Sequence, residues 1–144
     1  MPVPGKGRIL ALDVGEKRIG VAISDSSQTI AQPLTTLTRR AGKRFPMNSL
    51  RPYLEELCPV GIVVGLPLAS DGTEGERVES ARNAGDLITA KVNVPVTYWD
   101  ERMTTARALS AVKELGGHVR GRKGDVDQLA ATVLLQSFLD SRRK

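Results

Sequence analysis

Three acidic residues stand where a side chain can leave the core of an α/β protein. Asp13 closes a short apolar run, Glu101 follows a later one, and Asp127 lies near the start of the last helical pattern. Mg²⁺ and Mn²⁺ prefer oxygen ligands, usually a few carboxylates completed by water and substrate phosphate. If these three carboxylates converge, they would suit a divalent cation that works on a phosphate ester.

Other acids compete with these three in the sequence. Asp25 ends the second apolar run, while Asp100 and Asp125 are close neighbours of two of the chosen acids. Each chosen acid also has a plain structural explanation: a turn, an ion pair with Arg102, or the first turn of a helix. Spacing alone does not choose among them.

The chain offers little other chemistry for hydrolysis. It has one cysteine, Cys58, and one histidine, His118, which we expect in a solvated loop. Covalent hydrolysis normally needs a nucleophile with an adjacent base, and the sequence shows no serine–histidine or cysteine–histidine arrangement of that kind. Metal-assisted hydrolysis is therefore the favoured chemistry.

Basic residues accompany the candidate acids. Lys17 and Arg18 follow the turn after Asp13, and Arg102 adjoins Glu101. These cations could neutralise a substrate phosphate, although Arg102 could instead orient carboxylates through a bidentate bond. Both interpretations stay open.

A basic loop leads into the last helical segment. It contains Arg120, Arg122 and Lys123 among small or flexible residues. Such a loop suits contact with nucleic-acid phosphates, and a solvated loop without that role is the alternative.

The strands that would position the acids come in two groups. Residues 8–13, 18–24 and 34–38 predict three opening strands, the first two joined as a hairpin. Residues 61–65 form a continuous apolar run typical of a central strand, and residues 94–99 predict a fifth strand.

Helical patterns separate and follow the later strands. One helix is expected after Ser49 as N-cap, a second over residues 78–88, and a third after a cap at Thr104 or Thr105. The last helix is expected to begin near Asp125. Its predicted apolar stripe consists of Val126, Leu129, Ala130, Val133, Leu134 and Phe138.

This order predicts an α/β fold with one five-stranded mixed sheet, an antiparallel meander followed by parallel strands, and helices on both faces. We expect a single domain over residues 1–144. Ligands of such sheets collect at the carboxyl ends of the strands, where the candidate acids lie.

Composition points to a polyanionic partner. The chain has 21 Lys and Arg against 16 Asp and Glu, a net charge of +5. Aromatic residues make up only 3%, which disfavours a base-stacking platform and favours contact with backbone phosphates. The lone cysteine and the lack of a long apolar segment predict a cytoplasmic protein that does not enter a membrane.

Four sequence blocks resemble the YqgF family, also described as RuvX-like. They are Leu10–Ala22, Ile62–Pro67 with Asp71–Thr73, Asp100–Thr105, and Val126–Asp127 with Ala130–Ala131. The blocks occur in the family's order and span nearly the whole chain. Departures at Ala69–Ser70 and Gln128–Leu129 put one substrate contact in question and otherwise affect packing.

The resemblance implies a ribonuclease H-like fold and a carboxylate triad of Asp13, Glu101 and Asp127, which resolves the choice among the acids. It implies a nuclease that uses Mg²⁺ or Mn²⁺, with a two-metal site expected. Family members are described as nucleases of pre-16S ribosomal RNA, a role in ribosome biogenesis, or as Holliday junction resolvases. The expected partner is therefore pre-rRNA or structured DNA.

Two other function classes remain as alternatives. An actin-like or sugar-kinase-like phosphotransferase also uses an Asp-x-Gly turn, but it needs a second domain, and the chain lacks a Walker-type loop. A non-catalytic RNA-binding factor of ribosome assembly would bind RNA without metal. The sequence leaves open RNA against DNA, the mode of cutting and whether the chain forms a homodimer.

Overall fold

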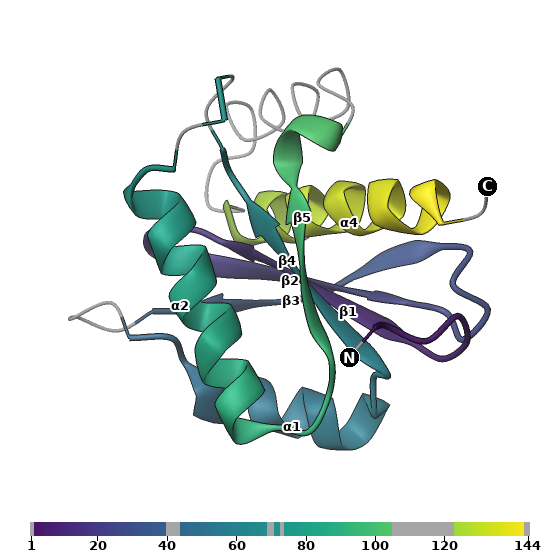
Figure 1. The fold of residues 1–144 in the computed structure, drawn as a ribbon. Helices are drawn as coiled ribbons and strands as arrows, with labels where there is room; N and C mark the ends of the chain where they lie inside the picture. Colours follow the sequence, from purple (N-terminus) through teal and green to yellow (C-terminus); the bar gives the residue numbers. More distant parts are fainter. Residues whose placement is uncertain (1, 40–43, 69–70, 73, 105–122, 143–144) are drawn as a thin grey trace.

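Five strands form one sheet with helices on both of its faces (Figure 1). The computed structural model describes residues 2–39, 44–68, 71–72, 74–104 and 123–142. The strands are β1 (Ile9–Val14), β2 (Arg18–Ser24), β3 (Ala31–Thr38), β4 (Gly61–Leu66) and β5 (Val96–Asp100). The helices are α1 (Met47–Leu57), α2 (Glu76–Lys91), the short 3-10 helix η1 (Glu101–Met103) and α4 (Lys123–Ser141).

The sheet is mixed, in the order β3-β2-β1-β4-β5. Strands β1, β2 and β3 pair antiparallel, whereas β4 pairs parallel with both β1 and β5. This confirms the predicted meander followed by parallel strands. The carboxyl ends of β1, β4 and β5 therefore meet at one edge of the sheet.

Alternating side chains divide the core into two layers. On one face Leu10 and Leu12 of β1 belong to a cluster that includes residues of α1 and α2. On the other face Ile9 and Ala11 pack with residues of α4. Figure 1 shows α4 (yellow) on one side of the sheet, and α1 and α2 on the other. The prediction of helices on both faces is confirmed.

Helix α4 is attached to the sheet by polar as well as apolar contacts. The side-chain amide of Gln136 accepts a hydrogen bond from the backbone N–H of Ala31 and donates one to the carbonyl of Thr29. The donor–acceptor distance is 2.9 Å in each bond. At β5, the edge strand on the far side from β3, Trp99 packs edge-on against Phe138, with ring centroids 5.6 Å apart. These contacts hold one helix across the width of the sheet.

The buried face of α4 differs in part from the predicted stripe. Leu134 and Phe138 are buried as expected, but Val126, Leu129, Ala130 and Val133 are only half-buried. The other fully buried positions are Ala131, Leu135 and Leu139. Apolar residues occur nearly all round this helix, so the sequence pattern did not fix its rotation.

Several predicted element boundaries were wrong. β3 begins at Ala31 rather than Leu34, because Pro33 is tolerated in this edge strand. α1 begins at Met47 after Pro46, which makes Ser49 a residue inside the helix and not its cap. β5 covers residues 96–100 rather than 94–99, since its pairing with β4 begins at Val96.

The later helices were predicted with mixed success. The second was expected over residues 78–88 and is α2, which is longer. α4 begins at Lys123, so Asp127 lies beyond the first turn in which we expected it. The expected third helix falls within residues 105–122, outside the described residues. Across the described part of the chain, no helix has the length and apolar character needed to span a membrane.

Candidate active site at the carboxyl ends of the strands

Asp13 lies on the sheet face that α4 covers. Ile9 and Ala11 pack on that face, and residues two apart in a strand share a face. In the register of the sheet Asp13 stands opposite Gly20 of β2. Gly65 of β4 occupies the next position on the other side, one residue beyond the Leu12–Val64 pair. Asp13 is thus flanked by two glycines.

Gly20 brings the backbone of α4 into contact with the sheet. A Cβ atom at Gly20 would lie 1.9 Å from the carbonyl oxygen of Asp127, so no larger residue fits there without moving the helix. Because Gly20 neighbours Asp13 across the strand pair, this close approach places the Asp127 main chain near Asp13. Two of the three predicted acids are brought together in this way.

Gly65 lies beside Glu101 on the other side of Asp13. A Cβ atom at Gly65 would lie 3.4 Å from Cγ and 3.5 Å from Cδ of Glu101, and 2.2 Å from a methyl group of Leu134. The Glu101 side chain therefore extends over β4 toward the α4 face. Its Oε2 atom is shielded from solvent. The third predicted acid thus lies on the same side of the sheet as the other two.

Short-range bonds on both sides fix the main chain at Glu101. Asp100 caps η1 by accepting a hydrogen bond of 2.9 Å from the backbone N–H of Arg102. Thr104 donates its N–H to the carbonyl of Glu101 over 3.0 Å, and its hydroxyl accepts a hydrogen bond from Trp99. Glu101 is therefore held between two anchored residues.

Arg102 binds Asp100 through its guanidinium group as well. Nε and one terminal nitrogen contact the Asp100 carboxylate, the shortest distance being 2.7 Å. The hydrogen bond from Arg102 is the main cause that lowers the pKa of Asp100. Of the two interpretations left open for Arg102, the structure favours carboxylate orientation. The guanidinium also lies beside Gly72, in the loop after β4.

The competing acids Asp100 and Asp25 lie elsewhere. Asp100 lies two residues after Tyr98 in β5 and so shares its face of the sheet, which α2 covers. Its carboxylate is bonded to Arg102. Asp25 follows β2 at the opposite end of the strands, beside the amino end of β1, since β2 runs antiparallel to β1. Its carboxylate accepts hydrogen bonds from Ser27 and from the backbone of Thr29 and Ile30, which lower its pKa to about 2.

The Asp127 carboxylate is bonded to Arg18. The Arg18 Nε atom donates to Oδ2 over 2.7 Å. Arg18 lies two residues before Gly20 in β2 and so shares its face of the sheet. This ion pair was not predicted, because we considered Arg18 only as a ligand for phosphate.

Three carboxylates over two glycines offer the hard oxygen donors that Mg²⁺ or Mn²⁺ requires, so the residue types fit such a cation. They do not yet form a closed ligand set. Among the described residues, no group of three or more His, Cys, Asp or Glu side chains is arranged to hold a metal ion. The Oδ2 atom of Asp127 is bonded to Arg18.

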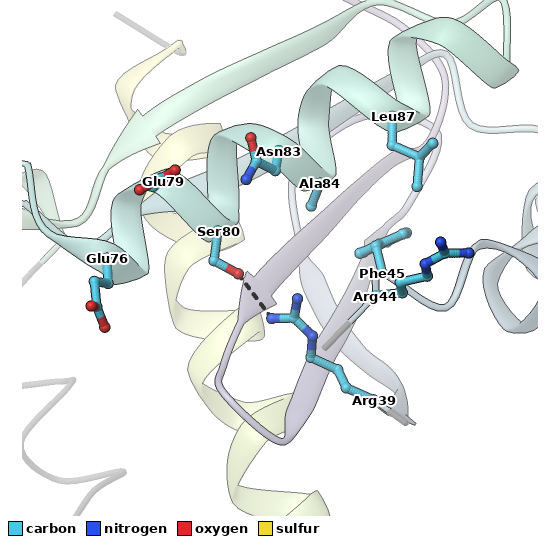
Figure 2. A pocket seen from close by; sticks show the side chains of 9 residues that line it. All are labelled: Arg39, Arg44, Phe45, Glu76, Glu79, Ser80, Asn83, Ala84 and Leu87. Atoms are coloured by element: carbon cyan, nitrogen blue, oxygen red, sulfur yellow. Dashed lines mark hydrogen bonds between the residues drawn. The ribbon is translucent and has the colours of Figure 1, made fainter. Parts of the chain in front are cut away.

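Of three clefts that the described residues form beside α2, two have part of their lining in common. They measure about 340 and 260 Å³ and share Arg39, Glu76 and Ser80. Figure 2 shows the larger one, where Arg39 binds the Ser80 hydroxyl over 2.9 Å. The same nitrogen of Arg39 donates to the carbonyl of Gly15 over 3.0 Å and thereby supports the turn that follows Asp13.

The remaining predicted residues are placed as follows. Lys17 is exposed in the turn between β1 and β2. His118, Arg120 and Arg122 lie outside the described residues, and of Lys123 only the main chain is described, as the first residue of α4.

Our sequence interpretation missed Gly20, Gly65 and Arg39. A glycine inside a strand often marks a close approach of another backbone or ligand, and two such glycines near the predicted acids were a usable signal. Arg39 carried no comparable signal, because its partners come from distant parts of the chain.

Solved structures with a similar fold include two Holliday junction resolvases. T. thermophilus RuvC in complex with a Holliday junction substrate matches with a TM-score of 0.61 at 13% identity, over 95% of this chain and 96% of RuvC. The yeast mitochondrial resolvase Ydc2 matches with a TM-score of 0.59 at 14% identity, over 96% of this chain and 80% of Ydc2. The fold is therefore that of the ribonuclease H-like resolvases, as predicted.

Sequence comparison identifies the family. The model of the family described as "RuvX: Holliday junction resolvase" matches residues 7–141. A Clostridium botulinum protein named "Putative pre-16S rRNA nuclease" is 44% identical over 92% of this chain and 96% of its own length. A Chloroflexus aurantiacus protein of the same name is 41% identical over 94% of this chain and 88% of its own length. The chain belongs to the RuvX family of nucleases.

Proposed function

We propose that this protein is a divalent-metal-dependent nuclease that hydrolyses phosphodiester bonds of nucleic acid. Asp13, Glu101 and Asp127 would hold Mg²⁺ or Mn²⁺, with two ions expected. The observation that carries the proposal is the placement of two acids on either side of Asp13: Gly20 admits the Asp127 main chain, and the Glu101 side chain lies beside Gly65 on the same face of the sheet.

The chain's own residues would divide the work at this site. Divalent cations, when bound, would activate water for attack on phosphorus and stabilise the charge on the leaving oxygen. Asp13, on a central strand between the two glycines, would be the central ligand of the site. Glu101 and Asp127 would each complete one side.

Substrate phosphates would be neutralised by basic residues around the acids. Lys17 is exposed next to the carboxyl end of β1, and Arg120, Arg122 and Lys123 precede or begin α4. Arg102 would act indirectly, because its guanidinium orients Asp100 in the turn that presents Glu101. Binding would therefore depend strongly on salt, as expected for phosphate contacts.

We infer that the substrate is pre-16S ribosomal RNA, cut in the processing of its 5′ end. Support comes from relatives of 41% and 44% identity that bear this name and match over most of their length. We place the protein in the cytoplasm, in keeping with its single cysteine.

A four-way DNA junction is the second candidate substrate. The family description and the similarity to a RuvC structure that contains such a junction favour it. Symmetric cutting of a junction requires two active sites, so this substrate would require a homodimer. Pre-rRNA cut at one position needs a single copy.

One experiment tests activity and substrate together. Purified protein is incubated with a pre-16S RNA fragment and with a four-way DNA junction, in Mg²⁺, in Mn²⁺ and in excess EDTA, and the cut positions are mapped. We expect cutting of the RNA that needs the cation. Full activity in EDTA would contradict the metal site, and cutting of the junction alone would favour the second candidate.

Variants separate catalysis from binding. Asp13→Asn, Glu101→Gln and Asp127→Asn preserve side-chain size and should each abolish cutting while RNA binding persists. Asp125→Asn is the matched control and should stay active, because residue 125 lies about 200° around the helix from residue 127. If all three triad variants still cut, the proposed metal site of Asp13, Glu101 and Asp127 fails. RNA binding without any cutting, with or without metal, would instead indicate a non-catalytic assembly factor.

A further inference from the structure

Arg18 and Asp127 form an ion pair between segments that lie far apart in the sequence. The residues are 109 positions apart, and the Arg18 Nε atom lies 2.7 Å from Asp127 Oδ2. The side chains remain 35% and 28% exposed, respectively. A cation from solvent can therefore reach the Asp127 carboxylate without unfolding of the helix.

The main chain around this pair has little freedom to move. Arg18 and Gly20 lie two residues apart in β2, on the face that α4 covers. The Asp127 carbonyl is packed so closely on Gly20 that a Cβ there would lie 1.9 Å from its oxygen. A change of partner by the Asp127 carboxylate must therefore come from rotation of its side chain.

The carboxylate that Arg18 holds is also required by the proposed metal site. Asp13 lies opposite Gly20, and Glu101 lies beside Gly65 on the same face. Carboxylates that share a site repel one another when no cation is present. A guanidinium beside Asp127 reduces that repulsion, since an arginine side chain stays positively charged at every relevant pH. A divalent cation that takes Oδ2 of Asp127 would therefore compete with Arg18 for this atom.

We propose that Arg18 is a positioning residue that acts as the counter-ion of Asp127 in the metal-free protein and is displaced from it by the divalent cation. This inference rests on the proposed function, because it takes Asp127 to be a metal ligand. After displacement Arg18 keeps its charge at the rim of the site and faces the anionic substrate. The protein thereby exchanges an internal cation for a metal ion.

Calorimetric titration with Mn²⁺ in the absence of nucleic acid tests the competition. Arg18→Met should bind Mn²⁺ about two- to fivefold more tightly than the unchanged protein, the scale expected when a part-exposed ion pair no longer competes. Lys17→Met removes the same charge one residue away and should raise the affinity less. The same two substitutions are then made in the Asp127→Asn protein, where the ion pair is already absent. There Arg18→Met should raise the Mn²⁺ affinity no more than Lys17→Met does.

A second measurement needs no substitution of Arg18. The Nε–Hε resonance of Arg18 in an NMR spectrum reports its bond to Asp127. Addition of Mg²⁺, which is diamagnetic, should shift this resonance in the unchanged protein and leave it in place in Asp127→Asn.

The results distinguish this inference from the proposed function. If Mn²⁺ binds with equal or lower affinity in Arg18→Met, or if the Arg18 resonance stays in place at saturating Mg²⁺, Arg18 is not displaced and the inference is wrong while the metal site stands. If the unchanged protein binds neither ion, the proposed metal site fails and this inference fails with it.

Discussion

The adjacent acids Asp100 and Glu101 have different surroundings, since Asp100 ends β5 and Glu101 begins η1. Asp100 caps η1 and binds Arg102, and those hydrogen bonds lower its pKa. Glu101 extends over Gly65 toward α4. Neighbouring positions in the sequence thus hold one acid that stabilises a turn and one that faces α4.

The three triad acids should differ in what they contribute to stability without metal. Asp13→Asn and Glu101→Gln relieve repulsion between carboxylates and should leave the free energy of unfolding unchanged or slightly higher. Asp127→Asn also breaks the ion pair with Arg18 and should lower it by up to about 1 kcal/mol. Urea denaturation in EDTA measures the difference. Equal stability of all three variants would show that the ion pair contributes nothing.

Asp25 should give the protein a stability that depends on acid pH. Its pKa is about 2 in the folded chain against 3.8 ordinarily, because Ser27 and two backbone N–H groups bind the carboxylate. A lowered pKa stabilises the fold above pH 3.8, and this contribution disappears as pH falls toward 2. We expect Asp25→Asn to be less stable than the unchanged protein at neutral pH and the gap to close in that window. Urea titrations at several pH values provide the check, and a gap independent of pH would rule out this account.

At the residue scale the sequence predicted the positions of the acids better than their partners. The ends of strands are visible as transitions from apolar to polar residues, so Asp13 and Glu101 could be placed without a structure. The bond between Arg18 and Asp127 could not be predicted from the sequence, because it depends on how α4 lies on β2. Long-range contacts of this kind have no local pattern.

At the scale of elements, α4 and β2 are in direct backbone contact, which is unusual for a helix on a sheet. Side chains normally keep the two layers apart, and here Gly20 has none. The contact lies at the end of the helix where Asp127 stands, while Phe138 packs on Trp99 farther along. The helix is thus brought closest to the sheet where the site is.

Alanine at the two strand glycines should have unequal effects. In Gly20→Ala the new Cβ meets a backbone oxygen at 1.9 Å and cannot be accommodated by a rotamer change. We expect a loss of about 1–3 kcal/mol in the free energy of unfolding and loss of cutting. In Gly65→Ala the closest atom is a methyl group of Leu134, which can rotate away, so the loss should be smaller. Chemical denaturation ranks the two, and the reverse order would contradict the helix placement described above.

Element order and type were predictable, whereas boundaries and rotations were not. The alternation of apolar runs and helical spacing predicted all five strands and their pairing pattern. The start of β3 was missed because Pro33 was taken as a breaker, although an edge strand accepts it. The rotation of α4 was missed because its sequence is apolar on several sides.

At the scale of the whole molecule, the positive charge is expected to act mainly near the acids. Binding to a polyanion releases counterions, so its salt dependence counts the cations that contact phosphate. A net charge of +5 alone does not say where those cations lie. Two triple substitutions, one in the basic sequence before α4 and one at the amino ends of the parallel strands, can locate them.

Changing Arg120, Arg122 and Lys123 together to Ala should weaken nucleic-acid binding and flatten its salt dependence. If each residue meets one phosphate, the slope of log K against log salt should fall by about 2 to 3 units. The control removes the same charge at the amino ends of the parallel strands, through Lys6, Arg8 and Lys91, all exposed. Charges that far from the bound strand are screened at physiological salt, where the Debye length is about 8 Å, so the control should change the slope little. An unchanged slope in the first variant, or an equal change in both, would show that these three cations do not contact the nucleic acid.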